Sequence, residues 1–382
     1  MTKLEQLIQE LCPNGVKYLK IGEVVNYEQP SKYIVSSTDY NDAFDIPVLT
    51  AGQTFILGYT NEKNGIYYAS KEEPVIIFDD FTGAFKWVDF PFKVKSSAMK
   101  ILTVEDKRTF LRYIFYVMGY IGYSSTEHKR LWIGLYSEIE IPVPPLPVQS
   151  EIVRILDTFT ELTTELTTEL TTRKQQYEHY TYQLLNFDDT VQTHQLRELI
   201  DFRNGKGHEK DIVSDGKYIV VNSKFISTNG EVKKYSNKQI CPLFVDDILM
   251  VMSDLPNGRA LAKCFLVAEN DKYTLNQRIG AFHVKDESVI KTKFLLYVLN
   301  RNQQLLKYDN GVDQTNLRKD DILDIMIPIP SIEEQERIVA ILDRFDTLCN
   351  DISEGLPAEI EGRRKQYEYY RDKLLTFKEL SK

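Results

Sequence analysis

The feature that most constrains this chain of 382 residues is an internal sequence duplication. Residues 141–162 align with residues 327–348 at an offset of 186, and 11 of these 22 positions are identical. A second block, 173–187, aligns with 363–377 at an offset of 190, with 8 of 15 positions identical. Because both blocks recur in the same order, the chain is an internal duplication in which about 190 residues are used twice.

The repeated blocks predict long helices. Apolar residues recur in each at three- and four-residue spacing, which is typical of one buried helix face: Ile152, Ile155, Leu156, Phe159 and Leu162, then Ile338, Ile341, Leu342, Phe345 and Leu348. Ser331 followed by Glu334 predicts a capping box at the start of the second helix. The first copy has Pro145 in place of that serine, and Pro147 in the first turn partly compensates.

The middle of the first helix carries the tetrapeptide Thr-Glu-Leu-Thr three times in tandem, over residues 160–171. The second copy has Gly355-Leu356-Pro357 instead, which should break or kink its helix and restart it at Pro357. A continuous helix over 149–187 would be roughly 58 Å long. So long a helix needs a partner, and the other copy, packed antiparallel, is the obvious one.

The segments that precede the two blocks, residues 1–148 and 188–330, are similar in outline and different in detail. Each should contain short β-strands and one apolar helix, because β-branched and aromatic runs alternate with turn residues. The clearest matching pieces are strands near 74–78 and 247–252, helices near 110–118 and 294–299, and the opening segments 21–25 and 196–200. Tyr113, Phe115 and Tyr116 are expected in the core of the first domain.

Composition excludes several classes of protein. The sequence contains no run of eighteen apolar residues, so no membrane span is predicted. The amphipathic N-terminal stretch lacks the apolar core of a secretion signal. Four widely separated cysteines argue against a zinc site or a disulfide framework. Asp79-Asp80 and Glu72-Glu73 are interpreted as surface turns, so no metal site is predicted. A reduced, cytoplasmic protein is expected.

With two variable domains, two similar helical segments and two helices that contain Gln-Tyr-Glu, the chain resembles the specificity (S) subunit of type I restriction-modification systems. Residues 78–87 and 276–279 also look like stretches of its target-recognition domains. The resemblance implies an internally duplicated α+β fold with two globular domains separated by two long antiparallel, coiled-coil-like segments. Its parts would be recognition domain 1 (1–148), a central helical spacer (149–187), recognition domain 2 (188–330) and a C-terminal helical segment (331–382).

The resemblance also implies a non-catalytic role. Each recognition domain would read one half of a bipartite, gapped target in double-stranded DNA. The helices would set the spacing and dock two methyltransferase (M) subunits, and two restriction/translocase (R) subunits can join such an assembly. S-adenosylmethionine, ATP and Mg²⁺ would then be bound by those partners, and this chain would bind no cofactor. In agreement, the sequence contains neither an adenine-methyltransferase motif nor a phosphate-binding loop.

Two other functions stay open at this stage. A coiled-coil scaffold without DNA specificity would explain the duplicated helices nearly as well. A standalone DNA-modifying enzyme is a weaker alternative, since the chain is short and lacks the motifs. The formal net charge of −9 seems to count against DNA, but it is unevenly spread. Residues 1–148 hold 15 basic and 18 acidic side chains, whereas residues 193–330 hold 20 and 18, so the second domain is mildly basic.

Candidate DNA contacts are polar and basic residues in turns, because Arg, Asn and Gln read base edges while Lys and Ser usually hold phosphates. In the first domain they are Gln53, Lys63, Asn64, Thr82, Lys86, Lys95, Ser96, Ser97, Lys129 and Arg130. In the second they are Arg203, Lys206, Asn222, Ser223, Lys224, Ser253, Asn257, Arg259, Asn276, Gln277 and Arg278. Five helix tyrosines are interpreted as a partner-binding surface: Tyr177, Tyr180, Tyr367, Tyr369 and Tyr370.

Overall fold

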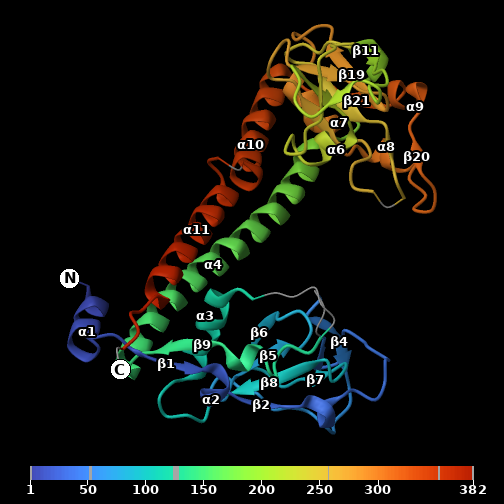
Figure 1. Cartoon of the computed structure of the whole chain (residues 1–382). Helices are drawn as coiled ribbons and strands as arrows, with labels where there is room; N and C mark the ends of the chain where they lie inside the picture. Colours follow the sequence, from blue (N-terminus) through green and yellow to red (C-terminus); the bar gives the residue numbers. More distant parts are fainter. Residues whose placement is uncertain (1, 51–53, 124–128, 257, 352, 381–382) are drawn as a thin grey trace. The chain divides into compact units, whose positions relative to one another are not determined.

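The computed structural model describes residues 2–50, 54–123, 129–256, 258–351 and 353–380. It divides the chain into two compact units (Figure 1). Unit 1 is Met1–Thr168 with Ala358–Lys382, and unit 2 is Glu169–Pro357. The helix α4 (Leu146–Leu185) is continuous through this division, so each unit contains a part of it.

Unit 1 is built on two sheets. The first is antiparallel, in the order β2 (Asn26–Glu28), β8 (Met99–Thr103), β5 (Val75–Asp79), β6 (Phe85–Val88). The second has the order β4 (Ile56–Thr60), β3 (Ile46–Leu49), β7 (Lys93–Val94), with β3 antiparallel to β4 and parallel to β7. The 3-10 helices η1 (Pro30–Tyr33) and η2 (Tyr136–Glu138) lie in its connections.

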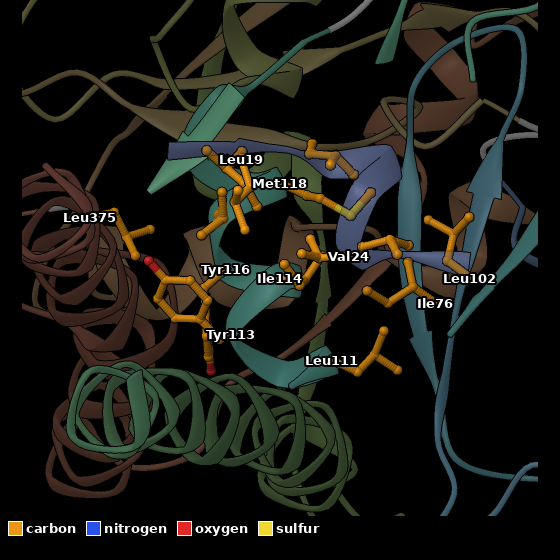
Figure 2. Close-up of a cluster of buried hydrophobic side chains, with 14 of the residues drawn as sticks. Leu19, Val24, Ile76, Leu102, Leu111, Tyr113, Ile114, Tyr116, Met118 and Leu375 are labelled. Atoms are coloured by element: carbon orange, nitrogen blue, oxygen red, sulfur yellow. The ribbon is translucent and has the colours of Figure 1, made fainter. Parts of the chain in front are cut away.

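Side chains of β5 alternate between two cores, as the two-residue period of a strand requires. Val75 and Ile77 point to the core between the two sheets. Ile76 points to the opposite face, where Leu102 of β8 and Ile114 of helix α3 (Leu111–Ile121) meet it (Figure 2). Tyr113 and Tyr116 of α3 are fully buried in this second core and Phe115 packs against it, which confirms their expected place.

Unit 2 repeats this topology with different residues. Its antiparallel sheet has the order β11 (Ile200–Asn204), β19 (Ile279–Val284), β15 (Ile248–Val251), β17 (Cys264–Leu266). Its second sheet has the order β12 (Ile212–Val213), β14 (Tyr235–Ser236), β13 (Tyr218–Val221), β18 (Tyr273–Leu275), with β13 antiparallel to β14 and parallel to β18. Strands β15 and β19 therefore correspond to β5 and β8, and β13 and β18 correspond to β3 and β7.

The remaining elements of the two units also correspond. The pair β1 (Lys17–Lys20) and β9 (Glu140–Val143) matches the pair β10 (Thr193–Gln195) and β21 (Met326–Pro328). The short helices α2 (Ile21–Val24) and α5 (Leu196–Leu199) open the two units, as the sequence predicts. Helix α7 (Thr292–Leu299) matches α3. Unit 1 also has α1 (Lys3–Leu11), and unit 2 has α6 (Ser223–Ser227), α8 (Gln303–Leu306), α9 (Lys319–Leu323), β16 (Ser253–Asp254) and β20 (Thr315–Asn316).

The helical segments agree with the expected pattern. The second copy is interrupted, because α10 (Ile332–Asn350) ends before α11 (Leu356–Leu375) begins next to Pro357. In unit 1, α11 lies beside α4 in the opposite direction, and the rings of Phe159 and Tyr370 stack with centroids 5.3 Å apart (Figure 1). The Ser331 side chain accepts a hydrogen bond from the backbone of Glu334 at 3.3 Å, which confirms the serine half of the predicted capping box. The Glu334 carboxylate pairs instead with Arg337 at 2.6 Å, so the other half of the box is not formed.

Two residues that are identical in both copies have the same role in each. The amide of Gln149 is fully buried and donates to the backbone carbonyls of Arg108 and Pro144, both at 2.8 Å. Gln335 is equally buried and donates to the carbonyls of Val289 and Pro330, both at 3.0 Å. Each glutamine therefore joins the chain entering the long helix to the loop before the apolar helix, which explains why the duplication retains it.

The interpretation of Asp79-Asp80 as a surface turn is wrong. The two residues are only 5% and 1% exposed. The carboxylate of Asp80 accepts hydrogen bonds from the backbone of Leu131 at 3.2 Å and of Trp132 at 2.8 Å, and it pairs with buried Lys100 at 3.4 Å. A buried carboxylate is tolerated when it is paired and bonded in this way. Asp80 therefore holds Leu131 and Trp132 against the end of β5, whereas the Asp79 carboxylate accepts from the backbone N–H groups of Phe81 and Thr82.

Candidate nucleic-acid interface

In unit 2, several predicted contacts meet where the chain crosses from one sheet to the other, at residues 276–278. The backbone N–H of Asn276 donates to the carbonyl of Val221, at the end of β13, at 3.1 Å. The N–H of Gln277 donates to the carbonyl of Lys206 at 3.0 Å. These bonds bring together three of the segments that the sequence singles out: 206–207, 222–224 and 276–278.

Local geometry makes this junction specific. A Cβ atom on Gly205 would lie 1.8 Å from the carbonyl oxygen of Asn276, so only glycine permits the close approach. Arg278 adopts a left-handed conformation with φ of 70°, which costs a non-glycine residue stability. The Arg278 side chain is exposed and has no hydrogen-bond or ion-pair partner within the described residues. The strained backbone therefore presents a free guanidinium at the junction.

A second arginine is presented by the loop after β16. The carboxylate of Asp254 accepts hydrogen bonds from three backbone N–H groups, those of Leu255 at 2.9 Å, Ala260 at 2.7 Å and Leu261 at 3.1 Å. A Cβ on Gly258 would lie 2.1 Å from this carboxylate, so the loop needs glycine there. Arg259 is exposed on the loop that these hydrogen bonds hold. Asn257 lies outside the described residues.

Unit 1 has the same junction with other side chains. The N–H of Lys95 donates to the carbonyl of Leu49 at 2.8 Å, and the N–H of Asp80 donates to the carbonyl of Ala98 at 3.1 Å. Lys95, Ser96 and Ser97 therefore occupy the crossing between the sheets. Exposed Lys129 and Arg130 lie next in sequence to Leu131, whose N–H donates to the Asp80 carbonyl at 2.8 Å. Gln53 lies outside the described residues.

Other predicted contacts lie apart from these junctions or are occupied by internal bonds. The guanidinium of Arg203 pairs with buried Asp247 and stacks on Phe244 at 5.3 Å. The Asn222 side chain caps α6 by accepting from the N–H of Phe225 at 2.9 Å. The Thr82 hydroxyl donates to Asp79 at 2.7 Å. Three residues lie apart from the junctions, namely exposed Lys63 and Asn64 in a turn and Lys86 on β6, whereas exposed Lys224 on α6 follows the junction segment of unit 2.

Most of the five helix tyrosines take part in contacts inside a unit. In unit 2 the rings of Tyr177 and Tyr180 lie 6.0 and 5.5 Å from that of Phe345, and burial raises the pKa of Tyr177. In unit 1, Tyr370 stacks on Phe159, and Tyr367 packs against the core. Tyr369 is 62% exposed, which leaves its ring available to a partner.

One segment of unit 2 was missed by sequence reasoning. The N–H of Leu317 donates to the carbonyl of Met252 at 2.8 Å, which is the counterpart of the bond from Leu131 to Asp80 in unit 1. Gln314 and Asn316 lie beside Ser253, to whose hydroxyl group both are bonded, and unit 1 has Arg130 at the position of Asn316. Comparing the two copies position by position would have indicated this segment, but the sequences differ too much there to align without the hydrogen bonds.

A metal site and a membrane-spanning helix are both absent from the part of the chain that the structure describes. No group of three or more His, Cys, Asp or Glu side chains there is placed to hold a metal ion. Within the same residues, no helix is both long enough and apolar enough to cross a membrane.

Comparisons with known proteins agree with this architecture. A family model described as the type I restriction modification DNA specificity domain matches residues 13–173 and again 188–362. The chain is 42% identical to the EcoR124I/EcoR124II specificity subunit of a type I restriction enzyme from Escherichia coli, over 99% of this chain and 97% of that one. It is 30% identical to a putative specificity subunit from Haemophilus influenzae, over 98% of both.

A solved structure supports the fold. The S subunit of the type I restriction-modification system from M. genitalium superposes with a TM-score of 0.60 at 14% identity, over 98% of this chain and 99% of that one. The two similar halves of this α+β fold coincide with the two matches to the DNA specificity domain, so the chain is a protein with two such domains. The chain belongs to the family of type I restriction-modification specificity subunits.

Proposed function

We propose that this chain reads a bipartite, gapped sequence in double-stranded DNA, with one half read by each unit. The observation that carries the proposal is the repeated junction between the two sheets. In both units, the same crossing segment and the same loop after the central strand come together, and their side chains differ. A conserved frame with exchanged polar side chains is what two readers of different half-sites require.

The charge distribution is compatible with this role. Arg259 and Arg278 of unit 2 and Arg130 of unit 1 are exposed, and such guanidinium groups grip guanine or phosphate by two hydrogen bonds. The chain as a whole is acidic, so partners should supply much of the positive surface that holds the DNA backbone. Binding by the isolated chain should therefore be weak and strongly dependent on salt.

The helices are proposed to dock two methyltransferase subunits, and in a restriction complex two R subunits would join them. S-adenosylmethionine, Mg²⁺ and ATP would be bound by those partners, with no cofactor on this chain. Exposed Tyr369 of α11 and the exposed face of the Thr-Glu-Leu-Thr segment are available for such contacts. The cytoplasm, where the DNA and the partners are found, is the expected compartment.

The test is co-expression of the chain with its methyltransferase subunit, followed by methylome sequencing. The proposal expects methylated adenines within a motif of two short half-sites separated by unread bases. A short continuous motif would contradict two separate readers. If no motif appears, and duplex DNA does not bind in salt titrations with the methyltransferase present, the chain is a scaffold without DNA specificity. Methylation by the isolated chain would instead identify an enzyme.

A further inference from the structure

Three polar side chains of unit 2 form a closed hydrogen-bonded triad beside the junction. Ser253, on β16, is 6% exposed and donates from Oγ to the Oδ1 of Asn316, on β20, at 2.7 Å. Gln314 donates from Nε2 to the Oγ of Ser253 at 2.8 Å and to the Oδ1 of Asn316 at 3.2 Å. The two amides are therefore oriented by a nearly buried hydroxyl group that is itself held in a sheet.

This orientation leaves one acceptor and one donor facing outwards. Because the Nε2 of Gln314 and the Oδ1 of Asn316 are used inside the triad, the Oε1 of Gln314 and the Nδ2 of Asn316 remain. Neither atom has a hydrogen-bond partner among the described residues, and both side chains are exposed. They line a polar cavity of about 340 Å³ together with Arg318 and two acidic residues, Asp313 and Asp321.

We propose that the triad is a specificity determinant that reads one adenine in the half-site of unit 2; this inference rests on the proposed function. In the major groove adenine presents an acceptor, N7, and a donor, the N6 amino group, which match the Nδ2 of Asn316 and the Oε1 of Gln314. Guanine presents two acceptors, so its O6 would face the Oε1 of Gln314 with no proton between them. The same pair therefore rejects guanine.

Charge favours a base edge over a phosphate at this place. Asp313 and Asp321 line the cavity together with one cation, Arg318, so acidic side chains outnumber basic ones and disfavour a phosphate group. The backbone N–H of Arg318, two residues after Asn316, donates to the carboxylate of Asp321 at 3.1 Å. This bond holds the Asp321 carboxylate close to the triad. A neutral base edge that offers an amino group is compatible with these acceptors, whereas the phosphate backbone is not.

The triad is continuous with the junction already described. Met252, which precedes Ser253, accepts a hydrogen bond from the N–H of Leu317 at 2.8 Å and donates its own N–H to the carbonyl of Arg278 at 2.9 Å. Met252 is therefore hydrogen-bonded both to Arg278 and to Leu317, the residue after Asn316 of the triad. In unit 1 the equivalent of Asn316 is Arg130, since Leu131 corresponds to Leu317 by its bond to Asp80. Among the described residues of unit 1, Phe81 and Arg130 stand where unit 2 has Ser253 and Asn316, so only one half-site should depend on the triad.

The experiment uses the full chain co-expressed with its methyltransferase, and methylome sequencing is the readout. Gln314→Ala and Asn316→Ala should each reduce the preference for adenine at one position of one half-site by about 5- to 100-fold. The other half-site and the spacer should stay unchanged. Ser253→Ala, which removes the orienting hydroxyl and keeps both amides, should relax the same position less. Asn237→Ala is the matched control, since this exposed amide lies outside the triad and accepts from the N–H of Lys217 at 3.3 Å.

Near-isosteric variants decide the question if an alanine variant loses its fold, as judged by its thermal unfolding midpoint. Asn316→Asp turns the outward donor into an acceptor and should move the preference at that position from adenine towards cytosine, which offers an amino group. An unchanged motif in all variants would overturn the assignment. A uniform loss of affinity over all sequences would overturn it as well, because it would mark a phosphate contact. A wild-type complex without any bipartite motif would instead refute the proposed function itself.

Discussion

At the scale of single residues, partly buried polar side chains hold the segments of each unit together. Asp157 of α4 is bonded by Tyr116 and Arg112 of α3, and Asp343 of α10 accepts from Tyr297 and Lys293 of α7, both at 2.6 Å. Each aspartate is a repeated position, so both units attach their apolar helix to the long helix in one way. Such residues are retained because a lost partner leaves a desolvated polar group, which costs about 1–3 kcal/mol.

Glu151 should make the stability of unit 1 sensitive to acid. Its side chain is 4% exposed and pairs with Arg154 at 2.7 Å and with Lys3 of α1 at 2.8 Å, and these partners lower its pKa from 4.5 to about 2. A carboxylate with a lowered folded-state pKa stabilises the protein above its unfolded pKa, and this stabilisation is lost as pH falls from about 4.5 to about 2.

The check is chemical denaturation of wild type and Glu151→Gln at a series of pH values. The variant should be less stable at pH 7, and its free energy of unfolding should fall less between pH 5 and pH 2. Exposed Glu161→Gln on the same helix is the control and should keep the wild-type slope. Parallel pH curves for wild type and Glu151→Gln would contradict the assignment.

At the scale of elements, two glycines in the C-terminal segment should respond oppositely to alanine. Gly355 lies in the break between α10 and α11, where a Cβ would lie 2.3 Å from the carbonyl oxygen of Thr347. Gly362 lies inside α11, where a Cβ would meet nothing within 4 Å. Gly355→Ala should destabilise the chain by about 1–3 kcal/mol through this overlap, and Gly362→Ala should stabilise it by about 0.5–1 kcal/mol through helix propensity.

Equilibrium unfolding in urea measures both glycine variants. The two substitutions add the same methyl group, so the difference in their signs isolates the space around each glycine from a general effect of alanine. Equal shifts of the unfolding midpoint for the two variants would show that the break between the helices is not tightly packed.

The Thr-Glu-Leu-Thr repeats of α4 should act as a length unit. The threonine hydroxyls donate one repeat length back along the helix, as in Thr163 to the carbonyl of Phe159 at 2.8 Å and Thr164 to that of Thr160 at 2.8 Å, so removing one repeat preserves this bonding pattern. Deleting one repeat should shorten α4 by about 6 Å. Under the proposed function, this should change the unread spacer by one to two base pairs, with a rise of about 3.4 Å each, and leave both half-sites intact.

Methylome sequencing of the deletion variant checks the length unit. Insertion of one repeat should lengthen the spacer by the same amount, and a four-residue substitution to alanine at constant length is the control. An unchanged spacer length in the deletion variant would contradict the proposal that α4 determines the spacer length.

At the scale of the whole molecule, the division into two units predicts that the two half-sites are independent. Arg130→Gln should affect one half-site and Arg278→Gln the other, each weakening binding of the assembled complex to its target by about 5- to 100-fold. The double variant should show the sum of the two free-energy changes to within about 0.5 kcal/mol, because the free-energy changes of independent sites add. Quantitative binding to duplexes altered in one half-site measures this, and a strongly non-additive double variant would argue for coupled readers.

Much of the fold could be predicted from local pattern. The strands near 74–78 and 247–252, the apolar helices and the break at Gly355 all agree with the structure, because their signals are local: β-branched runs, helical spacing and helix breakers. The candidate DNA contacts were harder to predict from the sequence. Arg203 has the right chemistry for a DNA contact, yet its partner Asp247 lies 44 residues away in the chain, and no local pattern reveals that ion pair.

The sequence by itself determined that this protein is a duplication, that its repeated parts are helices and that it resembles a specificity subunit, because repetition and periodicity are properties of the chain order alone. Only the tertiary structure decided that Asp79 and Asp80 are buried, and that Ser253 orients Gln314 and Asn316 from 61 and 63 residues away. The physical reason is that burial and hydrogen-bond direction depend on strand pairing between distant segments, which no neighbouring residue encodes.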